Sequence, residues 1–218
     1  MTDLAAPHYP TNGARWADLA VHLSGLALAL LGSGILLGLA FGLGTLSQVA
    51  AVSVYSVGLV LMLALSTAYN FGTARWQPLL RRFDHAGIFI MIAGSYTPFT
   101  TQNLHGAWAW GMTAAVWTVA GVGVLCKLFL PGLDRRFWVG LYLALGWLVL
   151  VAIRPMVEGL SWPALILLAI GGLIYTTGVV FYLSKRLRFR RAIWHGHVVS
   201  AAGVHYAAVL VGVVLGAR

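Results

Sequence analysis

Long apolar segments fill most of this sequence and limit its possible folds more than any other feature. Of 218 residues, 60% are hydrophobic and only 9% are charged, whereas charged residues make up roughly a quarter of a soluble domain. A surface so poor in charge cannot face water, and a helix that spans a bilayer needs about 20 mostly apolar residues. The sequence therefore predicts an all-α integral membrane protein: a polar tail at residues 1–16, then a seven-transmembrane-helix bundle at 17–218. The helices are expected at about 17–41, 46–70, 85–102, 107–129, 137–157, 161–183 and 193–216.

The distribution of basic residues predicts how this bundle is oriented. The chain has 14 Lys and Arg against 5 Asp and Glu, a formal net charge of +9. Most of the basic residues lie in the tail and in the loops after the second, fourth and sixth helices, while the loops after the first and third helices have none. Because basic loops stay on the cytoplasmic side, the N-terminus is expected in the cytoplasm and the C-terminus outside. The same rule explains the excess of positive charge, so the bilayer is the expected partner and nucleic acid is not.

Several polar side chains occur in these helices at the end assigned to the cytoplasm. Residues four apart on a helix share one face, and three helices each carry such a polar pair. Ionisable groups inside a membrane domain are candidate functional sites. His205 lies roughly 15 Å deeper than His195 by helical rise. The pairs are Asp18 and His22, Ser66 and Asn70, and Arg191 and His195, with Asp84 and His85 at the start of the third helix.

Three motifs resemble those of the hemolysin III family, bacterial relatives of the adiponectin and progestin receptors (the PAQR group). They are LSTAYN at 65–70, RRFDHAGIFIMIAGSYTPF at 81–99 and RAIWHGHVVSAAGVHY at 191–206, and ADLAVHLSG at 17–25 fits as well. The resemblance implies a multi-pass protein of the bacterial inner membrane. It also implies a zinc ion near the inner face, held by one histidine at the end of the second helix and two at the start of the seventh. The receptors resemble ceramidase-type hydrolases of lipid amides.

This chain keeps only part of the implied site. The resemblance assigns catalytic roles to Ser66 and Asp84 and a metal-ligand role to His195, but the other two ligand positions hold Asn70 and Arg191. Asparagine offers only an amide oxygen, and arginine stays protonated and repels a cation. Catalytic zinc normally has three protein ligands, so zinc binding at the family positions is doubtful in this chain.

The favoured interpretation of these substitutions is a metal-free site. Arg191 would bring positive charge to the place of the zinc and would pair with Asp84, since a buried carboxylate needs such a partner. Ser66 and Asn70 would complete a hydrogen-bond network, with His205 deeper in the same bundle. The protein would then be a pseudoenzyme that binds a lipid or fatty acid, or that acts in signalling.

Two alternatives stay open at this point. In the first, His22, His85 or His197 replaces the lost ligands and the protein is an active metal-dependent hydrolase. Residues two apart on a helix point about 200° apart, so His195 and His197 are not expected to face one ion. In the second, suggested by the family's name, the chain permeabilises membranes, which would require a polar path above His205.

Overall fold

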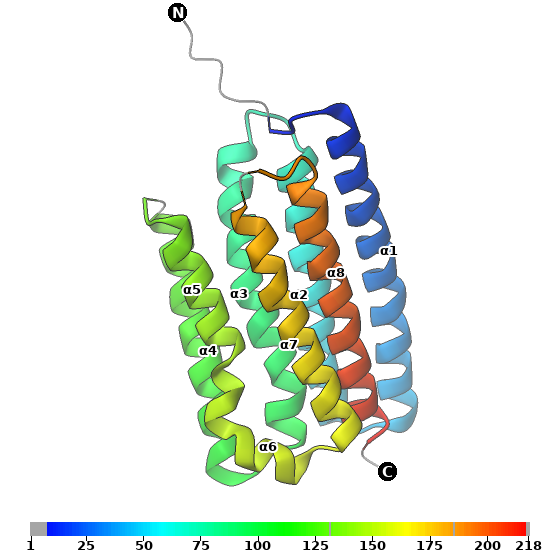
Figure 1. Cartoon of the computed structure of the whole chain (residues 1–218). Helices are drawn as coiled ribbons and strands as arrows, with labels where there is room; N and C mark the ends of the chain where they lie inside the picture. Colours follow the sequence, from blue (N-terminus) through cyan, green and yellow to red (C-terminus); the bar gives the residue numbers. More distant parts are fainter. Residues whose placement is uncertain (1–7, 131, 185, 217–218) are drawn as a thin grey trace, which may run out of the picture.

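The computed structural model describes residues 8–130, 132–184 and 186–216 and arranges them as a bundle of long helices (Figure 1). Six helical segments are long and apolar enough to cross a membrane: Asn12–Leu43, Leu46–Phe71, Gly106–Phe129, Arg135–Gly159, Trp162–Leu183 and Arg190–Val214. The protein is therefore an integral membrane helical bundle. The helices are α1 (Asn12–Leu43), α2 (Leu46–Phe71), α3 (Gln77–Gln102), α4 (Gly106–Phe129), α5 (Arg135–Gly146), α6 (Ile153–Gly159), α7 (Trp162–Leu183) and α8 (Arg190–Val209).

The helix α3 differs from these six spans. It has 26 residues, enough to cross a bilayer, but it is less apolar, because its first turns carry Arg81, Arg82 and Asp84. It packs against both α2 and α4, so protein rather than lipid covers much of its surface. The predicted start at residue 85 is too late: the helix begins at Gln77, where Pro78 in the first turn favours a helix start.

Two other predicted boundaries also differ from the structure. α1 begins at Asn12, inside the predicted polar tail, because the Thr11 side chain accepts a hydrogen bond from the Ala14 backbone at 3.2 Å and caps the helix. The predicted helix at 137–157 is broken into α5, a 3₁₀ segment at Leu148–Ala152 and α6. Pro155 lacks the backbone N–H that a continuous α-helix would need there, which favours this break.

The close approach of α1 and α8 brings polar residues of both helices together. The two helices lie side by side (Figure 1), and Gly25 of α1 faces Val199 of α8. A Cβ atom at Gly25 would lie only 2.6 Å from Val199 Cγ2, so a larger residue would separate the helices. Because Gly25 lies one turn beyond His22 and Val199 one turn beyond His195, this contact sets the spacing of the polar residues.

We expect Gly25→Ala to lower the free energy of unfolding by about 1–3 kcal/mol, since the added methyl group would overlap Val199. Gly34→Ala on the same helix is the matched control, because no atom lies within 4 Å of a Cβ there. That variant should match the parent or gain up to about 1 kcal/mol. Unfolding by SDS titration in mixed micelles measures both, and equal stabilities would contradict the close packing of α1 on α8.

Candidate functional site

A buried carboxylate and two imidazoles form the centre of the candidate site. Asp18 is fully buried, and ligand atoms of Asp18, His22 and His195 all lie within 4.8 Å of one another. His195 Nδ1 donates to Asp18 Oδ1 at 2.6 Å, which joins α8 to α1. His22 Nδ1 donates to the Asp18 backbone carbonyl at 2.8 Å, so His22 Nε2 can accept from the Ser66 hydroxyl at 3.2 Å. The cluster thus connects three helices, α1, α2 and α8.

Arg191 and Asn70 form a second polar layer beside this cluster. Arg191 Nη1 donates to Asn70 Oδ1 at 3.1 Å, and Asn70 Nδ2 donates to the Ser66 backbone carbonyl at 3.0 Å. The two substituted family positions therefore bind each other. The prediction that Arg191 pairs with Asp84 is wrong: within the described ranges, the structure contains no ion pair between them. Asn70, at the end of α2, accepts the hydrogen bond from the Arg191 guanidinium that was predicted to go to the Asp84 carboxylate.

The segment before α1 contributes two further side chains. Tyr9 donates from its hydroxyl to Asp18 Oδ2 at 2.5 Å, and the His8 ring lies between Asn70 and Arg191. His8 Nε2 is 3.1 Å from Asn70 Oδ1, and Arg191 Nη2 is 3.4 Å from His8 Nδ1. Burial, together with the nearby Arg191 charge, lowers the pKa of His8, so the ring is neutral at pH 7 and Nδ1 can accept. Burial and the bond to Asp18 raise the pKa of Tyr9, which keeps its hydroxyl a donor.

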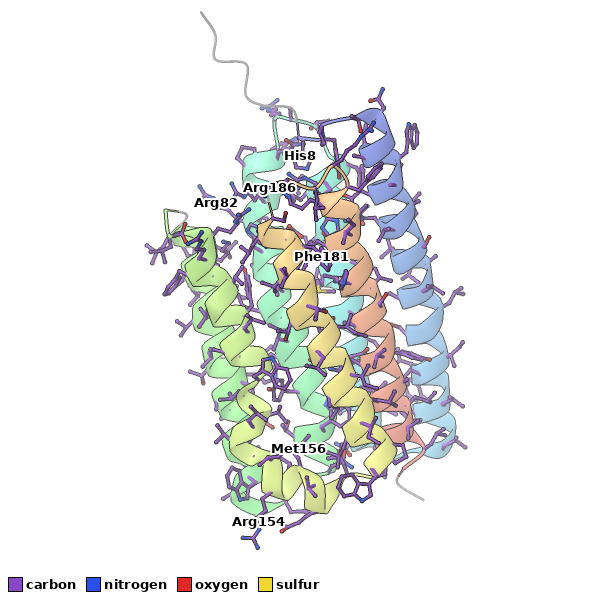
Figure 2. All side chains as sticks on the ribbon, in the orientation of Figure 1. His8, Arg82, Arg154, Met156, Phe181 and Arg186 are labelled. Atoms are coloured by element: carbon purple, nitrogen blue, oxygen red, sulfur yellow. The ribbon has the colours of Figure 1, made fainter. Side chains whose placement is uncertain are left out.

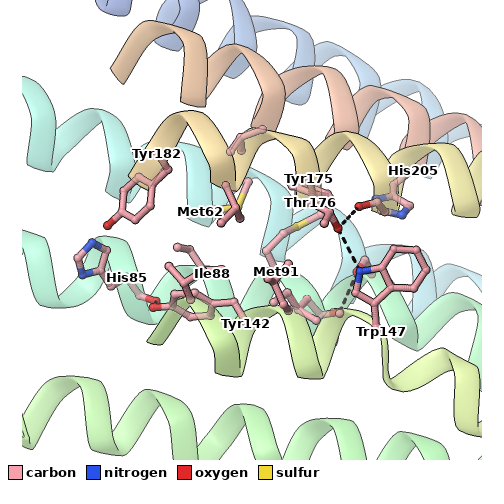
Figure 3. A pocket seen from close by; sticks show the side chains of 18 of the residues that line it. Met62, His85, Ile88, Met91, Tyr142, Trp147, Tyr175, Thr176, Tyr182 and His205 are labelled. Atoms are coloured by element: carbon pink, nitrogen blue, oxygen red, sulfur yellow. Dashed lines mark hydrogen bonds between the residues drawn. The ribbon is translucent and has the colours of Figure 1, made fainter. Parts of the chain in front are cut away.

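A large cavity extends from this polar cluster into the bundle. Its volume is about 770 Å³, within the range of roughly 300–1,000 Å³ that is usual for ligand pockets. Its other lining is largely apolar and aromatic, and includes Met62, Ile88, Met91 and Tyr142 (Figure 3). The cavity reaches far along the bundle, since Phe99 near the end of α3 also lines it. At its polar end it is lined by His22, Ser66, Asn70, Asp84, His85, Arg191 and His195.

The remaining predicted residues lie outside the cluster. Asp84 and His85 line the cavity from α3 but do not belong to the group of possible metal ligands found among the described residues. His197 bonds through Nδ1 to the Ile193 carbonyl at 2.8 Å and packs on Phe181 of α7, away from His195. His205 lines the cavity, stacked on Tyr175 with ring centroids 5.6 Å apart (Figure 3).

Sequence reasoning missed two contributing residues, His8 and Tyr9, and did not foresee the main contact of a third, Asp18. Asp18 was visible as the partner of His22 four residues later, but nothing in the sequence indicated that it would contact His195, 177 residues away. His8 and Tyr9 lie in a segment that reads as a polar tail. No periodicity or motif marks them, because only the tertiary fold brings that segment over the end of α2.

Comparisons with known proteins identify relatives over most of the chain. A family model described as Haemolysin-III related matches residues 16–206. The chain is 36% identical over 171 residues to Hemolysin-3 of Bacillus cereus, covering 77% of each protein. It is 29% identical over 195 residues to the Hemolysin-3 homolog of Bacillus subtilis (strain 168), covering 89% of this chain and 92% of that protein. Human Monocyte to macrophage differentiation factor is 30% identical over 167 residues, which cover 72% of this chain and 67% of that protein.

We expect Asp18→Ala to lower the free energy of unfolding by about 1–3 kcal/mol, because Tyr9 and His195 both lose a buried acceptor. Glu158→Ala is the control: its bond with Arg154 is exposed, and exposed ion pairs contribute little. SDS titration of both variants measures the difference. If Asp18→Ala were as stable as Glu158→Ala, the buried cluster would not contribute to the fold.

Proposed function

The chain belongs to the hemolysin III family, and we propose that it binds a single-chain lipid, such as a fatty acid, between its helices without a metal ion. One observation carries this proposal: a cavity of about 770 Å³ joins a cluster of polar side chains to a long apolar interior. A molecule that fits this lining has one polar end and one long apolar chain. The lipid's polar end would lie near Asn70 and Arg191, and its chain would extend toward Phe99.

Positive charge at the polar end favours an anionic lipid head. Arg191 contacts the neutral groups Asn70 and His8, so within this described cluster its charge is available to a ligand. Arg81, Arg82, Arg135 and Arg190 also line the same end of the cavity. Guanidinium groups bind carboxylates and phosphates through two parallel hydrogen bonds, so a fatty acid or a lysophospholipid fits this end better than a cationic lipid.

The charge distribution supports a proposed orientation in the membrane. We propose that α3 is a seventh span, with the end that carries His8, Arg82 and Arg186 on the cytoplasmic side. Arg154 lies at the opposite end of the bundle (Figure 2). The excess of basic residues at the first end favours this orientation, and the Bacillus relatives favour a bacterial inner membrane.

The metal-free part of the proposal depends on Arg191. The bonds of Arg191 and Asn70 to each other and to His8 occupy the two positions where the family resemblance implies histidine ligands. A guanidinium there repels a cation. Both carboxylate oxygens of Asp18 accept hydrogen bonds, from Tyr9 and His195, and His22 bonds to the Asp18 backbone carbonyl and to Ser66. The buried carboxylate therefore has donors without a metal ion.

A metal-dependent hydrolase of lipid amides is the second candidate function. One specific observation favours it: Asp18, His22 and His195 offer one carboxylate and two imidazoles within 4.8 Å, a donor set of the type and number found in catalytic zinc sites. These three residues would hold the ion, which would supply Lewis acidity toward an amide carbonyl. Asp84, on the cavity wall, would be the nearby carboxylate able to accept a proton.

We expect Ile88→Trp to reduce the binding of radiolabelled oleate at least tenfold, because the indole would fill the part of the cavity next to Ile88 and Met91 (Figure 3). Ile35→Trp is the matched control, since Ile35 is 59% exposed on the outer face of α1. Filter binding of purified protein in mild detergent, with unfolding curves recorded alongside, compares the two. Equal oleate binding by the two variants would contradict the proposed site.

We expect elemental analysis of the purified protein to find less than one-tenth of a zinc ion per chain. An Asn70→His, Arg191→His double variant should bind close to one, since it would regain both family ligands beside His195 and lose the repelling guanidinium. One zinc per chain in the unchanged protein, lost on Asp18→Ala, would overturn the metal-free proposal and support the second candidate.

A further inference from the structure

Two side chains of the N-terminal segment cover the polar site from outside the cavity. Tyr9 bonds to Asp18 through its hydroxyl, and its ring stacks on Phe71 with centroids 5.9 Å apart and planes 16° apart. The guanidinium carbon of Arg191 lies 5.5 Å from the centroid of the same ring. Tyr9 therefore contacts residues of α1, α2 and α8 at once.

His8 extends this cover to the two substituted family positions. Its two ring nitrogens contact Asn70 and Arg191, and its ring packs edge-on against Tyr69 with centroids 5.2 Å apart. The segment thus places an imidazole between the asparagine and the arginine that stand where the family resemblance implies histidines. No helix or strand forms at residues 8–10, so side-chain contacts hold this segment in place.

The position of Asn70 shows that His8 and Tyr9 separate the polar site from a depression on the outside of the protein. Asn70 lines the large cavity on one side and, on the other, a shallow depression formed by His8, Tyr9 and neighbouring residues up to Gln77. His8 and Tyr9 line the depression but not the cavity. Removing their side chains would leave Asn70 and Asp18 open to the depression and hence to the aqueous phase.

We propose that His8 and Tyr9 form a cap that closes the polar site on this side, so that a ligand enters the cavity past Arg81, Arg82, Arg135 and Arg190, which line its polar end. The cap deepens the proposed lipid-binding function by setting the side from which a ligand reaches the site. It also positions the site, because Tyr9 holds one oxygen of Asp18 while His195 holds the other. Because side-chain contacts hold residues 8–10, where no helix or strand forms, the cap can be released without unfolding the bundle.

Thiol accessibility in the full-length protein tests the cap directly. Ser66 is 8% exposed and bonds to Asn70, which His8 contacts, and Ser66→Cys in a Cys126→Ala background provides a single reporter thiol. The reagent is a cationic methanethiosulfonate, applied to protein in phosphatidylcholine nanodiscs, because the arginines that line the polar end of the cavity repel a cation and disfavour its entry from that side. Intact-mass spectrometry follows the rate of modification. Ser47→Cys, exposed at the other end of α2, gives the reference rate for an uncovered thiol.

We expect a His8→Ala, Tyr9→Ala double variant to react at least tenfold faster at position 66 and at an unchanged rate at position 47. Tyr9→Phe removes only the bond to Asp18 and keeps the ring on Phe71, so it should show a smaller acceleration. Asn12→Ala, an exposed neighbour, should react at the parent rate. If the double variant fails to fold, Tyr9→Phe decides the question.

Equal rates for Tyr9→Phe and Asn12→Ala in the Ser66→Cys background, with the double variant no faster, would overturn the cap. Oleate binding by the same variants separates this outcome from failure of the lipid-binding proposal. Faster labelling without any oleate binding would support the cap and contradict the proposed function. Oleate binding with unchanged labelling rates would support the function and contradict the cap.

Discussion

The buried carboxylate of Asp18 is the interaction on which the rest of the site depends. A charged group with no exposed surface requires hydrogen-bond donors close by, since an unpaired buried charge is very costly. Here the donors to the carboxylate come from two other parts of the chain, His195 on α8 and Tyr9 before α1. His22, one turn along α1, donates to the Asp18 backbone carbonyl instead. One acidic side chain thereby joins the two ends of the sequence at one end of the bundle. The close contact of Gly25 with Val199 makes this possible by holding α1 against α8.

Asn70 and Arg191 change the chemistry around this carboxylate. At positions where the family resemblance implies metal ligands, they form a hydrogen-bonded pair and bind His8. Arg191 thus brings the positive charge of a guanidinium to a position where the resemblance implies a metal ligand. A guanidinium binds anions and does not polarise a carbonyl as a metal does. This chemistry supports the proposal that the site holds the head of an anionic lipid.

The cavity and the proposed cap together define how a ligand would enter the site and how it would lie there. The apolar wall of the cavity continues along α3 from Ile88 to Phe99. This shape suits a lipid whose acyl chain lies parallel to the helices. Tyr9 and His8 cover the other side of the polar cluster. A ligand would then approach past the arginines that line the polar end of the cavity, where its head meets positive charge first. The proposed function and the proposed cap both follow from this one-sided arrangement.

The sequence by itself determined the fold class and the approximate place of the site. Apolar segments of spanning length specify membrane helices, because only a helix satisfies its own backbone in lipid, and the motifs at 65–70, 81–99 and 191–206 identify the family. The pairs four residues apart also indicated that polar groups gather at one end. The helix bounds were less predictable. The polar first turns of α3 gave no sign that it begins at Gln77, and the segment that starts with α5 is interrupted by a 3₁₀ turn before Pro155.

Only the tertiary structure decided which polar residues meet. Sequence reasoning paired Arg191 with Asp84 because both are charged and lie at a similar depth. The fold instead places Arg191 against Asn70 and gives the carboxylate role to Asp18, 177 residues from its partner His195. Periodicity describes which residues share a face of one helix, but it contains no information about how neighbouring helices rotate toward each other. That rotation, set here by the packing of Gly25 on Val199, decides which side chains come within hydrogen-bond distance.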